Sequence, residues 1–323
     1  MSASYDRISQ YLHYINQQII GQEGLVKRLF IALLADGHLL VEGAPGLAKT
    51  TAIKTLAEGL EGEFHRVQFT PDLLPADLTG TEIYRPQDGS FHFQQGPLFH
   101  NLLLADEINR APAKVQSALL EAMGERQITV GRTTYQLPKL FLVMATQNPI
   151  EQEGTYPLPE AQLDRFLMHI FIDYPSVESE KKILQLVRSQ SMAQPNSYVS
   201  KPQEISQADI FSARDDILKL HMSEAVEDYI VQFVTATRDP QHYGEDLPRW
   251  VMYGASPRGT ISLDRCARVN AWLEGRDYVA PQDVQEVVKD VLHHRVIMTF
   301  EAEAEGITSR DFINELIQRV PVP

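Results

Sequence analysis

The 323-residue sequence contains one cysteine, Cys266, and no long apolar run. A single thiol cannot form a disulfide within the chain, and it cannot build a cysteine-based zinc site. No apolar stretch approaches the roughly 18 residues that a membrane-spanning helix requires. The first residues also lack the basic patch and the apolar stretch of a secretory signal peptide. We therefore expect a cytoplasmic protein with no membrane span.

Positive charge is also scarce, with 29 Lys and Arg residues against 43 Asp and Glu residues and a formal charge of −14. Both parts of the chain are acidic, at −9 for residues 1–180 and −5 for residues 181–323. Nucleic-acid binding depends on basic side chains that neutralise phosphates, so this balance disfavours DNA and RNA as partners. A small basic pore on an acidic shell stays open as an alternative.

The ten histidines show no spacing typical of a metal site. His293 and His294 are adjacent, so they point to different faces of a helix, and we expect both to be solvated. The sequence therefore gives no reason to expect a transition metal.

Apolar stretches and helical patterns alternate along the first half of the chain. Residues 5–19 have helical spacing, a second helix follows Gly21, and further helical patterns lie after Thr50, at 112–126 and at 159–166. Short apolar stretches predict five buried strands, at His38–Glu42, His65–Thr70, Leu102–Asp106, Leu140–Thr146 and Met168–Asp173. This alternation predicts an α/β core with a mostly parallel five-stranded sheet covered on both faces.

Two segments interrupt the alternation, and a different pattern follows them. Residues 82–95, with Gln87-Asp88-Gly89, and residues 127–137, centred on Gly131, are predicted to form hairpins. Beyond residue 176 only helical patterns remain, at 207–220, 223–238, 257–274, 281–294 and 309–319. We therefore expect an α/β core over residues 1–176 and an all-α domain over residues 177–323.

The segment Gly43-Ala-Pro-Gly-Leu-Ala-Lys-Thr50 joins an expected strand to an expected helix, which is the setting of a phosphate-binding loop. Glycines let backbone N–H groups turn toward phosphates, and the N-terminus of the helix adds partial positive charge. In such a loop Lys49 reaches the β and γ phosphates and the Thr50 hydroxyl holds Mg²⁺. Ala48 replaces the usual glycine, which is harmless if its φ is negative, as at the start of a helix.

Two adjacent carboxylates, Asp106 and Glu107, end the third expected strand. The carboxyl ends of parallel strands form the edge where α/β proteins bind their ligands. Successive strand residues point to opposite faces, so we expect Asp106 to meet the Mg²⁺ shell and Glu107 to polarise the attacking water.

Three further polar residues are candidates for a role in phosphate chemistry. Asn148 ends the fourth expected strand and is able to sense a γ-phosphate, or to cap its own Asn-Pro turn. Arg165 is a candidate arginine finger, or the partner of Asp164 in a surface ion pair. Arg258 follows the expected helix start at Ser256 and opposes the helix dipole, so a negative partner is expected beside it.

In order, the chain contains Ile19-Ile-Gly-Gln22, the Gly43–Thr50 loop, Asp-Glu-Ile-Asn-Arg110, Thr-Gln-Asn-Pro149, Leu-Asp-Arg-Phe166 and Ser-Pro-Arg258. Over roughly residues 5–295 it resembles the MoxR family of AAA+ ATPases, including the Ala-Lys-Thr ending of the loop and the positions of the two hairpin inserts. The resemblance implies a P-loop core, a helical lid and the cofactors ATP and Mg²⁺. It implies that the nucleotide is bound by Ile20, Gly21, Gly43, Pro45, Gly46, Leu47, Ala48, Lys49, Thr50 and Thr51.

The same resemblance assigns roles to the remaining motifs. It makes Thr50 and Asp106 the residues of the Mg²⁺ site, Glu107 the hydrolytic base, Asn148 sensor 1, Arg165 a finger acting on a neighbouring subunit and Arg258 sensor 2. Members of this family are thought to be hexameric, chaperone-like machines. They often act with proteins that carry a von Willebrand factor A domain, to mature enzymes or insert metal cofactors.

We expect a ring-forming ATPase that remodels protein clients. One alternative is a nucleic-acid motor of the minichromosome-maintenance type, in which the hairpins grip DNA. The hairpins argue against it, because residues 82–95 hold only Arg85 against Glu82 and Asp88, and residues 127–137 hold only Arg132. A slow ATP-dependent switch that signals through ring assembly is the second alternative.

Overall fold

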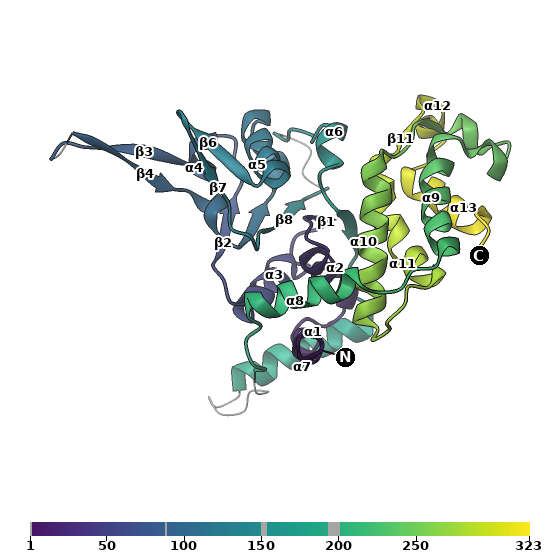
Figure 1. Cartoon of the computed structure of the whole chain (residues 1–323), viewed down its shortest axis with the longest axis horizontal. Helices are drawn as coiled ribbons and strands as arrows, with labels where there is room; N and C mark the ends of the chain where they lie inside the picture. The colour runs from purple at the N-terminus through teal and green to yellow at the C-terminus, as the bar shows by residue number, and fades with distance from the viewer. Residues whose placement is uncertain (1, 88, 150–153, 193–200) are drawn as a thin grey trace. The chain divides into compact units, whose positions relative to one another are not determined.

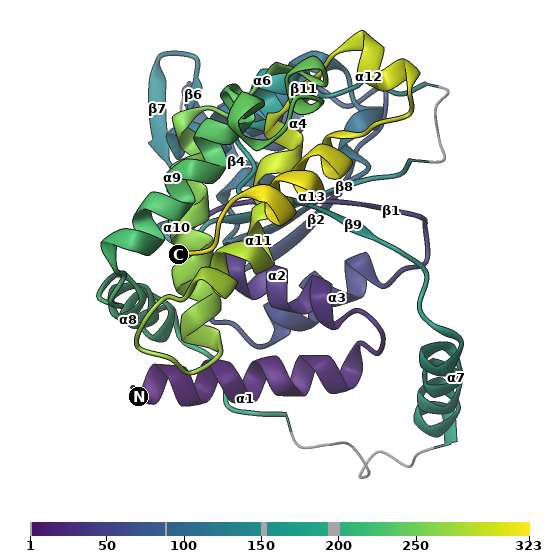
Figure 2. The same cartoon turned by 90° about the vertical axis from the view of Figure 1, so that its right-hand side faces the viewer.

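The structure is a computed structural model that describes residues 2–87, 89–149, 154–192 and 201–323. Figures 1 and 2 show it from two directions. The chain falls into two compact units. The first, called the α/β unit, contains residues 2–158 and 170–211, and the second, called the helical unit, contains residues 159–169 and 212–323. Asp88, in the turn of the first expected hairpin, lies outside the described residues.

A five-stranded sheet is built in the order β2-β5-β8-β1-β9. Its β2–β5, β5–β8 and β1–β8 pairs are parallel, and every residue of β5 is buried, as in a sheet covered on both faces. The five strands are β1 (Leu39–Gly43), β2 (Phe64–Gln68), β5 (Leu102–Asp106), β8 (Leu142–Gln147) and β9 (Met168–Ile172). All five predicted strands are confirmed, with their ends within two residues of the expected positions.

Helices cover the sheet because each buries one apolar face. Ile8, Tyr11 and Ile15 of the first helix are fully buried at helical spacing, and the Tyr11 hydroxyl donates to the Thr55 carbonyl at 2.7 Å. In Figure 2 this first helix lies below two further helices, which in turn lie below the sheet. Figure 1 shows α5 on the opposite side of the sheet. The helices are α1 (Ala3–Gln18), α2 (Glu23–Leu34), α3 (Lys49–Glu58), the short α4 (Pro75–Thr79) and α5 (Ala113–Glu125).

Both predicted hairpins are confirmed, as β3 (Gly80–Arg85) with β4 (Ser90–Gln95) and β6 (Gln127–Val130) with β7 (Thr133–Gln136). In Figure 1 the β3–β4 hairpin extends away from the sheet. Phe93 of β4 stacks on Tyr135 of β7 with ring centroids 4.1 Å apart. This contact joins the two hairpins near their bases.

Residues 170–211 group with the α/β unit, including α7 (Val177–Met192) and the start of α8 (Gln207–Leu218). A backbone bridge joins Leu60 to Ile205, and Arg7 pairs with Asp209 at 2.9 Å. These two contacts explain why this grouping differs from the expected change at residue 176. The division into residues 1–176 and 177–323 stays a prediction.

The helical unit packs long helices around a buried polar pair as well as an apolar core. Asp283 is 1% exposed and accepts hydrogen bonds from Arg276 and Asn270, so its charge is compensated. A short antiparallel ribbon, β10 (Val251–Tyr253) with β11 (Ile297–Met298), was not predicted, because two or three residues show no readable alternation. The helices are α6 (Glu160–Leu163), α9 (Glu224–Arg238), α10 (Pro257–Leu273), α11 (Pro281–Leu292), α12 (Phe300–Ala304) and α13 (Ser309–Arg319).

Among the described residues, no helix has both the length and the apolar character needed to cross a bilayer.

The expectation that His293 and His294 are solvated is wrong. Both lie in the turn η5 (His293–Arg295) that follows α11, and they are 4% and 9% exposed. With His169 they form a cluster whose ring nitrogens lie within 4.8 Å of one another. The reason is Arg295, which donates to the Phe166 carbonyl at 2.7 Å and pairs with Asp164 at 2.8 Å, and so draws the turn into the core.

Two histidines of the buried cluster, His293 and His294, are held in their neutral forms. The His293 Nε2 donates to the His169 carbonyl at 2.8 Å, and burial, followed by the neighbouring His169, lowers the pKa of His293 to about 3. Burial and then Arg295 lower the pKa of His294 well below its usual value. Arg295 also donates to the His294 Nε2 at 2.7 Å, which uses that lone pair and places a cation where a metal ion would meet repulsion.

We predict that acid destabilises the helical unit. Unfolded histidine titrates near pH 6.5, whereas His293 and His294 stay neutral when folded, so the unfolded chain binds more protons as the pH falls from about 6.5. Between pH 7.5 and 5.5 each excluded proton should lower the free energy of unfolding by about 1.4 kcal/mol. Urea unfolding followed by tryptophan fluorescence measures it, because Trp250 and Trp272 both lie in this unit.

His294→Gln should reduce the amount by which the free energy of unfolding falls between pH 7.5 and 5.5, whatever the effect of the substitution on stability at pH 7.5. His242 is an exposed histidine of the same unit, so His242→Gln is the matched control and should keep the full loss. Equal unfolding free energies at the two pH values would contradict the account.

Candidate functional site

The phosphate-binding loop connects β1 to α3. Strand β1 ends at Gly43, and α3 begins at Lys49 with no acidic residue in its first turn. Gly46 has a φ of +85°, a conformation that glycine adopts without strain. The loop therefore presents backbone N–H groups and the N-terminus of a helix, and both attract anions.

The residue before Lys49 is Ala48, and the negative φ expected for it is wrong. Ala48 has φ +60° and ψ 15°, in the left-handed region. An alanine there is strained by about 1 kcal/mol relative to glycine. The tight turn from the loop into α3 imposes this conformation, which helix periodicity does not reveal.

Lys49 is half-buried and points into the site. Its ammonium donates a hydrogen bond to the Gly43 carbonyl. Burial lowers the pKa of Lys49, and the carboxylates of Asp106, Glu107 and Glu42 oppose that effect. A half-buried cation bonded to a neutral carbonyl is well placed to bind an anion more strongly.

The side chains of Asp106 and Glu107 point in different directions because the strand ends between these two residues, and not because residues alternate along a strand. Asp106 is the last residue of β5 and is 9% exposed. Glu107 has φ +57° and ψ 51° and leads into the turn η2 (Ile108–Arg110). The expectation that strand alternation separates the two side chains is therefore corrected: a left-handed residue directs Glu107, and its N–H is held by the Thr146 hydroxyl at 2.9 Å.

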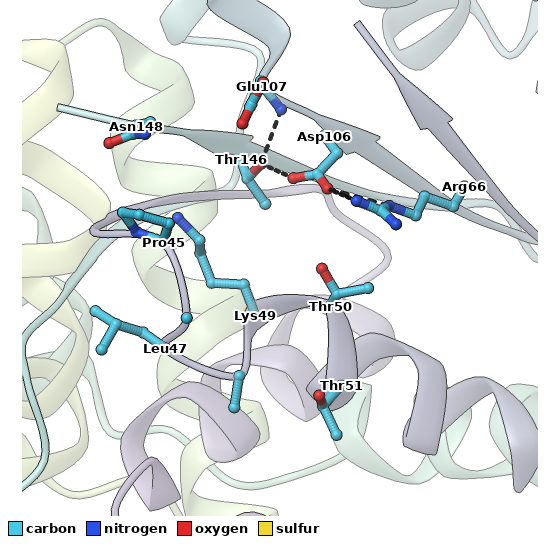
Figure 3. A pocket seen from close by; sticks show the side chains of 12 residues that line it. Pro45, Leu47, Lys49, Thr50, Thr51, Arg66, Asp106, Glu107, Thr146 and Asn148 are labelled. Carbon is cyan, nitrogen blue, oxygen red and sulfur yellow. Dashed lines mark hydrogen bonds and ion pairs between the residues drawn. The ribbon is translucent and has the colours of Figure 1, made fainter. Parts of the chain in front are cut away.

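Both oxygens of Asp106 accept hydrogen bonds, as Figure 3 shows. Thr146 of β8 donates its hydroxyl to Oδ1 at 2.5 Å. Arg66 of β2 donates Nη2 to Oδ2 at 2.7 Å and Nε to the same oxygen at 3.1 Å. Asp106 is thus fixed from the two strands that flank β5.

Glu107 is held by a different pair of donors. Its Oε2 accepts from Gln68 Nε2 at 2.7 Å and from Arg110 Nη1 at 3.2 Å. The neighbouring carboxylates therefore have separate partners, as two different chemical roles require.

These groups line one cavity of about 420 Å³, a volume within the usual range of small-molecule sites. In Figure 3 Lys49 and Thr50 rise from the loop toward Asp106, with Asn148 on one side and Arg66 on the other. The lining residues are Pro45, Gly46, Leu47, Ala48, Lys49, Thr50, Thr51, Arg66, Asp106, Glu107, Thr146 and Asn148.

The cavity thus joins most of the candidates from the first half of the chain. Gly43 contributes through its carbonyl contact with Lys49. Ile20 and Gly21 lie between α1 and α2 and do not line this cavity. Gly21 has φ +79°, and a Cβ there would lie 2.9 Å from Ser179, so the turn requires glycine. Contact of Ile20 and Gly21 with adenine stays a prediction.

Arg165 and Arg258 belong to the helical unit. The negative partner expected beside Arg258 is Asp164, at 3.5 Å. Ser256 caps α10, since its hydroxyl accepts the N–H of Arg258 at 3.2 Å, and the same hydroxyl donates to Asp164 at 3.0 Å. The expected roles of Arg165 as a finger and of Arg258 as sensor 2 stay predictions.

Three residues of the network, Arg66, Gln68 and Thr146, were not among the sequence candidates. Gln68 and Thr146 lie near the carboxyl ends of expected parallel strands, the edge where Asp106 ends its own strand, and Arg66 lies two residues before Gln68. The polar residues at these strand ends are the sequence signal for Gln68 and Thr146, whereas no local signal points to Arg66.

Comparison with known proteins places the chain among nucleotide hydrolases. A model described as "ATPase family associated with various cellular activities (AAA)" matches residues 38–168. A model described as "AAA lid domain" matches residues 250–316. The two matches fall on the segments that hold the cavity residues and Arg258.

Similar proteins cover nearly the whole chain. Chaperone MoxR1 of Mycobacterium tuberculosis is 46% identical, over 100% of this chain and 84% of that protein. Protein MoxR of Methylorubrum extorquens is 33% identical, over 98% of this chain and 96% of that protein. A crystal structure of a candidate ATPase from Cytophaga hutchinsonii has a TM-score of 0.89 and 46% identity, and the match covers 99% of this chain and 96% of that one. The α/β fold with a helical lid is confirmed.

We predict opposite effects for two substitutions in the cavity. Lys49→Ala should weaken ATP binding about tenfold or more, because a charge-assisted hydrogen bond contributes about 1.5–3 kcal/mol. Glu107→Gln should keep ATP affinity and lower the hydrolysis rate about 100-fold or more, as expected for loss of a general base. Calorimetric titration and phosphate release measure the two properties.

Lys54→Ala is the matched control, since Lys54 is an exposed lysine of the same helix outside the cavity, and it should leave both properties unchanged. Normal turnover by Glu107→Gln would exclude Glu107 as the base.

Proposed function

The chain belongs to the MoxR family of AAA+ ATPases, and we propose that it remodels client proteins as a cytoplasmic, hexameric ring driven by Mg²⁺-dependent ATP hydrolysis. The observation that carries this proposal is the single cavity that joins the phosphate-binding loop to Asp106, Glu107 and Asn148. The helical lid and the two projecting hairpins add the parts that a remodelling machine requires.

Binding uses the loop and the start of α3. The backbone N–H groups of the loop donate hydrogen bonds to the phosphate oxygens, and the Lys49 ammonium exchanges the Gly43 carbonyl for the β and γ phosphates. The exchange replaces a neutral partner with a charged one. Nucleotide binding is thereby favoured without a large movement of the loop.

The cavity has a donor set that suits Mg²⁺. Thr50 offers a hydroxyl oxygen and Asp106 a carboxylate oxygen, and both line the same cavity. Mg²⁺ prefers oxygen ligands and keeps several waters, so two protein oxygens with phosphates are sufficient. Bound there, the ion would supply charge neutralisation for the phosphates.

Hydrolysis then depends on Glu107 and its neighbours. The Glu107 carboxylate takes the proton from the attacking water, while Gln68 and Arg110 keep the carboxylate oriented. Asn148 is 7% exposed and lines the same cavity, and in this proposal its amide contacts the γ-phosphate. In this proposal Arg165 of a neighbouring subunit stabilises the charge that develops on the transferred phosphoryl group.

A protein client suits the surface of the β3–β4 hairpin. Ile83, Tyr84 and Phe91 are 44%, 54% and 67% exposed, and the two aromatic rings lie 5.3 Å apart. Exposed apolar groups of this size are typical of protein contacts. A relative is named a chaperone, which supports the same reading. A von Willebrand factor A domain protein as partner rests on the family resemblance alone.

We predict that Arg165 acts in trans. Arg165→Ala should bind ATP normally and hydrolyse it slowly, since an arginine finger contributes roughly 10³–10⁵ in rate. Lys49→Ala subunits keep Arg165 but have a defective pocket. Mixing these two inactive proteins should restore part of the phosphate release, because some interfaces then pair an intact pocket with an intact finger.

The control is a mixture of Arg165→Ala with the double variant Lys49→Ala/Arg165→Ala, which offers no finger and should give no rescue. If native mass spectrometry detects mixed rings of the two single variants and activity does not return, the proposed role of Arg165 in trans is wrong.

We also predict that nucleic acid is not the client. Among the described residues of the β3–β4 hairpin Arg85 is the one Lys or Arg residue, on the same strand as Glu82, and residues 127–137 carry only Arg132, so few phosphates are neutralised. Fluorescence anisotropy with single- and double-stranded oligonucleotides at about 150 mM salt should show no submicromolar binding. Tight binding, or strong stimulation of hydrolysis by DNA, would favour the motor alternative.

A further inference from the structure

Arg66 belongs to the edge strand of the sheet and lines the cavity. In the parallel β2–β5 pair Arg66 lies opposite Leu104, and Gln68 lies opposite Asp106. The Arg66 side chain therefore runs along the strand to reach Asp106, two residues further on. It is 50% exposed, whereas the Asp106 side chain is 12% exposed.

The contact occupies the oxygen of Asp106 that faces away from Thr146. Arg66 donates both Nε and Nη2 to Oδ2, while Thr146 donates to Oδ1. Both oxygens of the carboxylate already accept hydrogen bonds, so a water bound to a metal ion has to compete with Arg66 or Thr146 for them. A guanidinium beside the same oxygen also repels a divalent cation.

We propose that Arg66 is a positioning residue that competes with Mg²⁺ for Asp106, so that the ion binds well only together with nucleotide. This inference rests on the proposed function, because it assigns Asp106 to the Mg²⁺ site. In the cavity without nucleotide, Arg66 neutralises the carboxylate. Phosphate oxygens give the guanidinium a second anion to pair with, which frees Asp106.

The consequence is a coupling between metal and nucleotide. Nucleotide that draws Arg66 away from Asp106 raises the affinity of the protein for the metal ion. The metal ion raises the affinity for nucleotide by the same factor, because such coupling is reciprocal. Without Arg66 the metal should bind the nucleotide-free protein more tightly, and the coupling should shrink. A purely structural arginine would weaken both ligands or neither.

The test measures binding of Mn²⁺, as a probe for Mg²⁺, to the nucleotide-free protein by electron paramagnetic resonance. Arg66→Gln should bind Mn²⁺ about fivefold more tightly than the wild type, a factor at the upper end for a partly exposed ion pair. Arg66→Lys keeps the positive charge and should restore most of the wild-type value. Arg66→Met is the second neutral variant if Arg66→Gln does not fold.

Arg7→Gln is the matched control. Arg7 pairs with Asp209 in the same unit at similar exposure, with 40% of the arginine side chain exposed and 11% of the aspartate side chain. Breaking that pair should leave Mn²⁺ affinity unchanged. In the Arg66→Gln background, Asp106→Asn should remove the gain, which ties the gain to this carboxylate.

A second measurement repeats the Mn²⁺ titration with saturating ADP. The factor by which ADP tightens Mn²⁺ binding should be about fivefold smaller in Arg66→Gln than in the wild type. Unchanged Mn²⁺ affinity in Arg66→Gln, or a gain that survives Asp106→Asn, would overturn the proposal. If the wild type binds no nucleotide the proposed function fails, and the nucleotide-free titration still decides the role of Arg66.

Discussion

The parallel pairing of β2, β5 and β8 is the constraint on which the site depends. The pairing sets Gln68 opposite Asp106 and Ala105 opposite Ala145, so the polar ends of all three strands meet at one edge. There Arg66, Thr146 and Asp106 form their hydrogen bonds. A shift of one residue in either pair would turn these side chains to the other face of the sheet. The cavity is therefore a product of strand register.

Much of this arrangement was readable from local sequence. The five strands, both hairpins and the phosphate-binding loop are each encoded by neighbouring residues, and the structure confirms the strands and the hairpins. The Arg66–Asp106 contact was not readable, because it depends on which strands are neighbours. The buried position of His293 and His294 was missed for a related reason, since Arg295 and Asp164 lie far apart in the sequence.

Two residues of the site have backbones that a sequence pattern does not predict. Ala48 and Glu107 both have left-handed φ values, and both line the cavity. Such conformations cost about 1–3 kcal/mol each and persist where the surrounding structure holds them. For Glu107 the hydrogen bond from its N–H to Thr146 is one such restraint. The left-handed backbone of Glu107 and the register of the strands together give the Glu107 side chain an orientation that differs from that of Asp106.

The central claim is that this cavity binds the phosphates of ATP through Lys49. The most direct test is a crystal structure with Mg²⁺, ADP and aluminium fluoride, which stands in for the transferred phosphoryl group. The account predicts that Lys49 leaves the Gly43 carbonyl and that its ammonium contacts the aluminium fluoride, with Glu107 facing the attacking water. Nucleotide bound elsewhere, or Lys49 still bonded to Gly43 with nucleotide in the cavity, would contradict it.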